Sequence, residues 1–213
     1  MTTIVTTWSG EGGFTAKHVQ ALAKQVDEHA PFTRFVCITN HHVPGVMCWR
    51  PRHNWPGWWV KFEAFDPMIQ GDILYMDIDT VIVGPLDDIL RVNKLTLLRD
   101  FYRDGKRLKE GLQASLMMLP EADRAAPWER FIQDPQAFMA QNRVKGDQPM
   151  LEQCYMGRAQ KWQDILPGQL VSWKVDCNGA CFSPSSIPPE ARVIIFHGQP
   201  RPWQCKEFED LYK

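Results

Sequence analysis

The chain has 213 residues, with 24 Lys or Arg and 25 Asp or Glu, so its formal net charge at pH 7 is −1. This length is sufficient for one domain with a sizeable core. The near-neutral charge excludes a global field that would attract nucleic acid or an anionic membrane, so we expect no nucleic-acid partner. Any anionic ligand must be bound by local groups.

The amino-terminal residues MTTIVTTWSGEGG contain neither a basic leader nor an apolar run long enough for a signal peptide. No apolar segment reaches transmembrane length. The six cysteines are scattered, which favours reduced thiols, and Cys177 and Cys181 lack the second pair that a zinc site would require. We therefore expect a cytoplasmic protein without a transmembrane segment.

The first predicted elements are a strand over residues 4–8, a helix over 16–29 and a strand over 32–39. This strand–helix–strand order implies a parallel pair joined by a right-handed crossover. A short strand over 46–49 and a loop rich in Pro and Trp over 50–57 follow. The opening of the chain therefore indicates an α/β fold.

A helix over residues 58–68 precedes a strongly apolar strand over 73–76. Further strands are predicted over 95–98 and 112–119, joined by the charged segment 99–110, which is typical of a solvated loop or hairpin. The remaining predicted elements are helices over 122–132 and 147–156 and a strand over 193–196.

Two acids follow the apolar strand in the segment DILYMDIDTVIVGPL, residues 72–86. Ligands of open α/β sheets bind beyond the carboxyl ends of the strands, and alternation directs Asp77 and Asp79 to one side with Ile78 opposite. Two carboxylates at such a place favour a divalent cation. The alternative is that the acids satisfy local backbone amides, as turn residues often do.

Five segments, taken together and in order, resemble the GT-A glycosyltransferases of the glycogenin-like and bacterial lipopolysaccharide galactosyltransferase type. They are IVTTW, WWVKFEAF, DID followed by Gly-Pro-Leu, VKGDQPML and FHGQPRPW. The resemblance implies an α/β, Rossmann-like GT-A fold with a mixed, mainly parallel sheet flanked by helices in a single domain, residues 1–213. It divides this domain into a nucleotide-binding part, about 1–90, and an acceptor or sugar part, about 91–213.

The resemblance also implies the activity, which is transfer of a sugar from a nucleotide-sugar donor, with UDP favoured, and with retention of configuration. The acceptor, a glycan, a lipid-linked glycan or a protein, stays open. The family's metal ligands fall on Asp77, Asp79 and His197. An imidazole beside oxygen ligands favours Mn²⁺, with Mg²⁺ as the alternative. Taken alone, His197 has the competing interpretation of a hydrogen-bonded histidine at a strand end.

The resemblance also assigns the basic and catalytic residues of the family to positions of this chain. Lys61 and Arg201 match cations that contact the phosphate or the donor sugar, although each alone would be typical of a surface cation, and Gly198 would allow the backbone to approach the pyrophosphate. Asp147 and Gln148 match residues that face the reacting sugar. The alternative for Asp147 is an N-cap, for which Asp is favoured.

The nucleoside is expected at Thr6, Thr7 and Trp8, where Trp8 either stacks on the base or packs in the core. Asp100 lies where the family often has a sugar-binding acid. Gln113, followed by Ala114, replaces the common Asn-Ser pair, so the usual sugar contacts differ there. The complete predicted donor-binding set is Thr6, Thr7, Trp8, Lys61, Asp77, Ile78, Asp79, Asp100, Gln113, His197, Gly198 and Arg201.

Two other functions fit parts of the sequence. A strand followed by Asp-Ile-Asp-Thr-Val also resembles the nucleophile motif of haloacid-dehalogenase-type phosphatases, but that motif normally opens the domain. A non-catalytic nucleotide-sugar or carbohydrate-binding protein is the second alternative, and the altered Gln113-Ala114 pair favours it. Turnover of a donor with metal dependence would separate all three.

Overall fold

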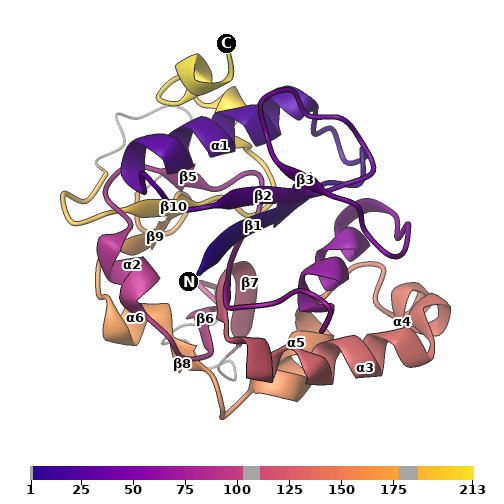
Figure 1. The fold of residues 1–213 in the computed structure, drawn as a ribbon. Helices are drawn as coiled ribbons and strands as arrows, with labels where there is room; N and C mark the ends of the chain where they lie inside the picture. Colours follow the sequence, from indigo (N-terminus) through magenta and orange to yellow (C-terminus); the bar gives the residue numbers. More distant parts are fainter. Residues whose placement is uncertain (1, 103–110, 178–186) are drawn as a thin grey trace.

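A seven-stranded sheet forms the centre of the computed structural model, which describes residues 2–102, 111–177 and 187–213 (Figure 1). In spatial order its strands are β3 (Cys48–Trp49), β2 (Phe35–Ile38), β1 (Thr3–Thr7), β4 (Ile73–Met76), β7 (Leu112–Leu119), β6 (Thr96–Arg99) and β8 (Gln160–Lys161). All neighbouring pairs are parallel except those of β7, which runs antiparallel to both β4 and β6. The predicted mixed, mainly parallel α/β sheet is confirmed.

A second, three-stranded sheet lies beside the first. It consists of β5 (Val81–Ile82), β10 (Val193–Ile195) and β9 (Leu170–Ser172), in which β10 pairs antiparallel with β5 and parallel with β9. Because β5 follows β4 directly and β10 leads into the carboxyl-terminal segment, this sheet brings residues 193–201 to the end of β4. Neither β5 nor β9 was predicted, since both are too short to show a periodicity.

Helices cover both faces of the large sheet. Figure 1 shows α1 on one side and α3, α4 and α5 on the other. The helices are α1 (Ala16–His29), α2 (Asp87–Arg91), α3 (Ala125–Gln133), α4 (Pro135–Gln141), α5 (Gln148–Tyr155) and α6 (Trp162–Ile165), with 3₁₀ segments η1 (Gly57–Phe65), η2 (Glu121–Asp123), η3 (Pro202–Gln204) and η4 (Glu209–Tyr212).

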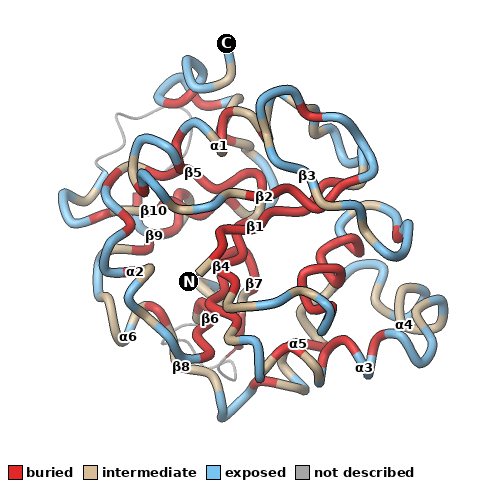
Figure 2. Tube along the Cα trace, in the orientation of Figure 1, coloured by how far each residue is buried: buried red, intermediate tan, exposed pale blue. Residues whose placement is uncertain are grey.

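Alternation along the central strands builds a separate core on each face of the sheet. In β1, Val5 packs with Phe62 and Phe131 on one face, whereas Ile4 packs with Leu22 on the other. The strands are therefore buried on both sides, as the red central segments of Figure 2 show. This double burial explains why β4 is a continuous apolar run.

Several predicted boundaries differ from the observed ones, among them the helix predicted over 122–132, which is η2 followed by α3. The second strand begins at Phe35, because Phe32 has a positive φ of 72° and is 97% exposed. The segment predicted as a helix over 58–68 forms the 3₁₀ segment η1, and α5 begins at Gln148. Most of the charged loop over 99–110, and Cys181, lie outside the described residues.

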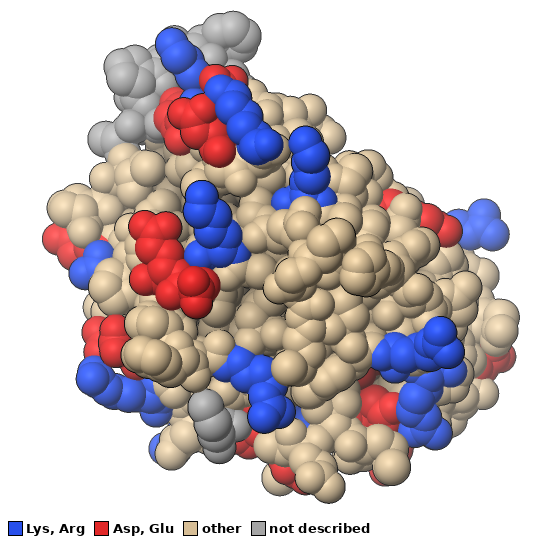
Figure 3. Space-filling model, turned by 45° about the horizontal axis from the view of Figure 1, so that its top comes forward, with Lys and Arg blue, Asp and Glu red and all other residues tan. Residues whose placement is uncertain are grey.

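Two further expectations concern thiols and membrane spans. All five cysteines in the described ranges are free thiols, namely Cys37, Cys48, Cys154, Cys177 and Cys205. Across residues 2–102, 111–177 and 187–213, none of the helices combines the length and apolarity that crossing a bilayer requires. Basic and acidic side chains are interspersed over the face in Figure 3, in keeping with the net charge of −1.

Candidate active site

A cleft of about 710 Å³ lies beyond the carboxyl ends of β1 and β4. The chain passes from β1 to β2 and β3 on one side and then returns to β4 on the other, so the strand order reverses between β1 and β4. Such a switch point is where open α/β sheets bind ligands. All predicted site residues except Thr6 and Asp100 line the cleft.

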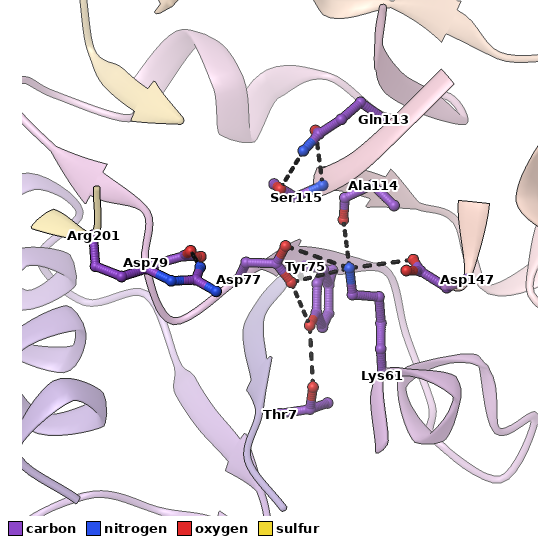
Figure 4. Close-up of polar contacts among 10 residues, drawn as sticks. All are labelled: Thr7, Lys61, Tyr75, Asp77, Asp79, Gln113, Ala114, Ser115, Asp147 and Arg201. Atoms are coloured by element: carbon purple, nitrogen blue, oxygen red, sulfur yellow. Dashed lines mark hydrogen bonds and ion pairs between the residues drawn. The ribbon is translucent and has the colours of Figure 1, made fainter. Parts of the chain in front are cut away.

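Lys61 lies at the centre of a buried charge network at one end of the cleft (Figure 4). Its Nζ is 3.1 Å from Asp77 Oδ1 and 3.2 Å from Asp147 Oδ2, and it donates to the carbonyl of Ala114 at 3.4 Å. Only 8% of the Lys61 side chain is exposed. Burial alone would lower the pKa of Lys61, but Asp147 and Asp77 raise it above its ordinary value, so the amine stays charged.

Tyr75 holds the carboxylate of Asp77 in place through a hydrogen bond. The Tyr75 hydroxyl donates to Asp77 Oδ1 at 2.9 Å, and Thr7 Oγ1 lies 3.0 Å from the same hydroxyl. Burial, followed by the charge of Asp77, raises the pKa of Tyr75 well above its ordinary value. Tyr75 is thus a permanent hydrogen-bond donor to Asp77.

The first strand contributes to the site differently from the prediction. Thr7 lines the cleft, but its hydroxyl contacts Tyr75. Thr6 is fully buried and does not line the cleft. Its role as a donor contact stays a prediction. Trp8 is 9% exposed, lines the cleft and contacts the ring of His41 at 4.9 Å.

Asp79 and Arg201 form an ion pair at the other end of the cleft (Figure 4). The Asp79 side chain is 5% exposed and that of Arg201 is 25% exposed. Burial, and then repulsion from Asp77, raises the pKa of Asp79 to about 6, although Arg201 opposes the shift. The Arg201 guanidinium also lies 5.2 Å from the ring centroid of Phe14.

His197 follows β10 and lies beside Ser172 at the end of β9. Its Nε2 is 2.8 Å from Ser172 Oγ, and the rings of Phe101 and Tyr102 lie 5.9 Å and 4.8 Å away. Burial, followed by the charge of Lys174, lowers the pKa of His197. The imidazole is therefore neutral near pH 7, which is the form that binds metals.

The predicted metal ligands share the cleft without forming a cluster. Within the described parts of the chain, no group of three His, Cys, Asp or Glu side chains is arranged to hold a metal ion. Asp77 is engaged by Lys61, Asp79 by Arg201 and His197 by Ser172. The donor types, two carboxylates and a neutral imidazole, fit Mn²⁺, and buried carboxylates attract whatever cationic group is nearest. Their joint role as ligands stays a prediction.

Asp147 and Gln148 mark the start of α5. Asp147 occupies the N-cap position of α5, as the alternative interpretation predicted, but its side chain makes no capping hydrogen bond and pairs with Lys61 instead. Gln148 Nε2 donates to Asp100 Oδ2 at 3.1 Å and to Glu152 Oε1 at 3.2 Å. Asp100 does not line the cleft itself and is connected to it through Gln148.

Three other predicted residues lie on the cleft wall. The Gln113 side chain folds onto Ser115, accepting a hydrogen bond from its backbone N–H at 3.0 Å and donating to its hydroxyl. Ile78 is 6% exposed, and Gly198 has a φ of 75°, a conformation that favours glycine. Gly198 thus permits the turn after His197.

Sequence reasoning did not identify Tyr75, Ser172 or Lys174. Alternation along the strand places Tyr75 on the same side as Asp77, so the sequence could have predicted a contact between them. For Ser172 and Lys174 no such prediction was possible, because β9 has only three residues and its pairing with β10 joins distant segments.

Known proteins resemble this chain in structure. No protein-family model matches the sequence, and no curated protein matches it. The glycosyltransferase GlyE of Streptococcus pneumoniae TIGR4 superposes with a TM-score of 0.70 at 15% identity, over 95% of this chain and 57% of GlyE. The galactosyltransferase LgtC, in complex with donor and acceptor sugar analogs, gives a TM-score of 0.65 at 14% identity, over 100% of this chain and 95% of LgtC.

The bifunctional glycosyltransferase WbbM gives a TM-score of 0.62 at 12% identity, over 99% of this chain and 48% of WbbM. The chain thus spans only about half the length of GlyE and of WbbM, but nearly all of LgtC. At these identities the likeness concerns the fold. The chain has the GT-A fold of these glycosyltransferases.

Proposed function

We propose that the protein is a metal-dependent glycosyltransferase that transfers a sugar from a nucleotide-sugar donor, UDP-linked, to an acceptor with retention. The observation that carries the proposal is the convergence of Asp77, Asp79, Lys61 and Arg201 on one cleft at the switch point of a GT-A fold. The LgtC structure with donor and acceptor sugar analogs, which has the same fold, supports this choice of ligand class.

The donor diphosphate would lie at the end of the cleft where Arg201 pairs with Asp79. Arg201 provides a guanidinium that can bind phosphate oxygens in a bidentate manner. Asp77, Asp79 and His197 would hold Mn²⁺, with Mg²⁺ as the alternative. When bound, the ion would neutralise the charge of the diphosphate leaving group. Arg201 would add to this stabilisation from the protein side.

The sugar would lie near Lys61, Asp147 and Gln148. Both N–H bonds of the Gln148 amide go to carboxylates, and within the described residues its oxygen accepts no hydrogen bond. This oxygen is therefore the group that can face a positively charged sugar as the glycosidic bond breaks. Lys61 holds Asp77 and Asp147 in fixed positions around that sugar.

The proposal of retention rests on the resemblance, and because the described residues show no activated nucleophile beside the sugar position, we favour a direct front-face transfer over a covalent intermediate. Within the described residues, the carboxylate of Asp147 is paired with Lys61 rather than with a base. The leaving diphosphate would then accept the proton of the acceptor hydroxyl on the same face of the sugar. Positioning and electrostatic stabilisation would supply most of the rate enhancement.

Calorimetry with UDP and Mn²⁺ tests the binding part. Wild type should bind UDP more tightly with Mn²⁺ than without it, and Asp77→Ala should remove the Mn²⁺ effect. Asp88→Ala, at an exposed ion pair with Arg91, is the matched control and should bind as wild type does. If the affinity of the wild-type protein for UDP is the same with and without Mn²⁺, the proposed metal dependence is refuted.

Incubation with UDP-α-D-galactose and UDP-α-D-glucose tests the chemistry. NMR of the first sugar released to water, or of the transferred product, should show the α anomer. A β anomer would refute retention. Binding without any release would support the non-catalytic alternative, and release of inorganic phosphate would support the phosphatase.

A further inference from the structure

The small sheet brings a lysine that no sequence motif identifies to the diphosphate end of the cleft. Strands β9 and β10 are parallel, with Ser172 opposite Ile195, so the residues that follow both strands leave the sheet at the same edge. Lys174 follows β9, and His197 and Gly198 follow β10. The Lys174 Nζ donates to the carbonyl oxygen of His197 at 2.7 Å.

Lys174 is close to the wall of the cleft. A Cβ added to Gly198 would lie 3.6 Å from Lys174 Nζ, and Gly198 lines the cleft together with His197 and Arg201. Because Gly198 has no side chain, it does not block the path from the Lys174 ammonium group to the cleft. The flexible stem of lysine allows the ammonium to reach a ligand there.

The charge around Lys174 is unbalanced. No carboxylate of the described residues forms an ion pair with Lys174, and the charge that acts on it is that of Arg201, whereas Asp100 and Asp176 act on the neighbouring His197. Burial, and then repulsion from Arg201, lowers the pKa of Lys174. Arg201 itself is paired with Asp79. Lys174 and Arg201 thus lie near one turn, and of the two cations only Arg201 forms an ion pair with a carboxylate of the described residues.

We propose that Lys174 binds the diphosphate of the donor as a second cation beside Arg201. The inference rests on the proposed function, because it names a further residue of the same site. Only one of the three ammonium N–H bonds is used by His197, so the others are available to phosphate oxygens. Lys174 has no carboxylate to release before it binds an anion, whereas Arg201 must leave Asp79.

Calorimetry at low ionic strength, in EDTA, tests the proposal with inorganic pyrophosphate, UDP and uridine. Lys174→Met should weaken pyrophosphate and UDP binding about tenfold to a hundredfold, the loss of one charge-assisted hydrogen bond. Uridine binding should not change, and Lys174→Arg should restore most of the affinity. The effect should shrink as salt screens the charge.

Lys24→Met, at an exposed position of α1, is the matched control and should bind all three ligands as wild type does. Unchanged pyrophosphate affinity in Lys174→Met would overturn the proposal. An equal loss for uridine would overturn it too, because the variant would then be structurally damaged. Wild type that binds neither pyrophosphate nor UDP in EDTA also overturns it. The transferase proposal is judged separately, by sugar release in the presence of Mn²⁺.

Discussion

The two ends of the cleft differ in how their charged side chains are paired. At one end, Lys61 lies between Asp77 and Asp147, and Tyr75 adds a hydrogen bond, so every charge has a partner supplied by the protein. At the other end, Arg201 pairs with Asp79, and Lys174 forms no ion pair with a carboxylate of the described residues. At the first end, Lys61 already pairs with both carboxylates, whereas at the second end we expect the negative charge of a diphosphate to be added.

This difference indicates which part of the site is preorganised. The Lys61 network joins η1 to the end of β4 and the start of α5, and we expect it to keep its geometry with or without the donor. The Arg201 end has a partly exposed guanidinium and a lysine held only by a backbone carbonyl, so its side chains can rearrange around a diphosphate. A rigid sugar end and an adaptable phosphate end would suit a donor that must enter and leave.

The largest expected effect comes from removing the centre of the rigid end. Lys61→Met leaves the partly buried Asp77 and Asp147 without a cation, and breaking a charge network around a buried lysine should cost up to about 3–5 kcal/mol of unfolding free energy. Thermal and urea unfolding should show this loss, while Lys24→Met should unfold as wild type does. Equal stability of the two variants would mean that the Lys61 network contributes no net stability.

Gln148→Ala should lower kcat without changing the affinity for UDP. The amide oxygen is expected to stabilise a sugar that becomes positive only in the transition state, so kcat should fall about tenfold to a hundredfold. The affinity for UDP should stay at the wild-type value. Gln133→Ala, on an exposed part of α3, is the control. A loss of UDP affinity with normal kcat would assign Gln148 to donor binding instead.

Asp79→Asn should stabilise the metal-free protein at pH 7. Because the folded-state pKa of about 6 lies above the ordinary value of 3.8, the charged carboxylate costs stability once the pH exceeds both values. The gain should be about 1–3 kcal/mol at pH 7, at 1.36 kcal/mol per pKa unit. As the pH falls from above 6 toward 4, the folded carboxyl becomes neutral, and the gain should disappear.

Melting temperatures of both proteins between pH 4 and 8 provide the measurement. The same variant should lose the Mn²⁺ effect on UDP binding. A variant less stable than wild type at pH 7 would show instead that the Arg201 pair outweighs the cost of burying Asp79.

Thr7→Val should have the smallest effect. It removes the contact between Thr7 and the Tyr75 hydroxyl but leaves the bond from Tyr75 to Asp77, so the loss of stability should be about 0.5–1.5 kcal/mol. If Thr7 only supports Tyr75, the affinity for UDP will change little. A large loss of UDP affinity without loss of stability would restore the predicted role of Thr7 as a nucleoside contact.

Much of the fold followed from local pattern. The helix over 16–29 and the strands over 73–76 and 112–119 have the boundaries that periodicity predicts, because each carries enough apolar positions to show a period. The short strands β5, β8 and β9 escaped prediction, since two or three residues carry no period. The GT-A fold was identified from the order of five motifs. These motifs extend over nearly the whole chain, whereas any single helix or strand is compatible with several folds.

The candidate site divides in the same way. The sequence by itself determined that Asp77 and Asp79 follow a buried strand, and the ordered motifs associated Lys61, Asp147, His197 and Arg201 with them. Only the tertiary structure decided how these charges pair. Asp79 meets a guanidinium 122 residues away, and His197 meets Ser172 and Lys174 through the pairing of β9 with β10. Such pairings depend on strand order and on packing between distant segments, which no local pattern encodes.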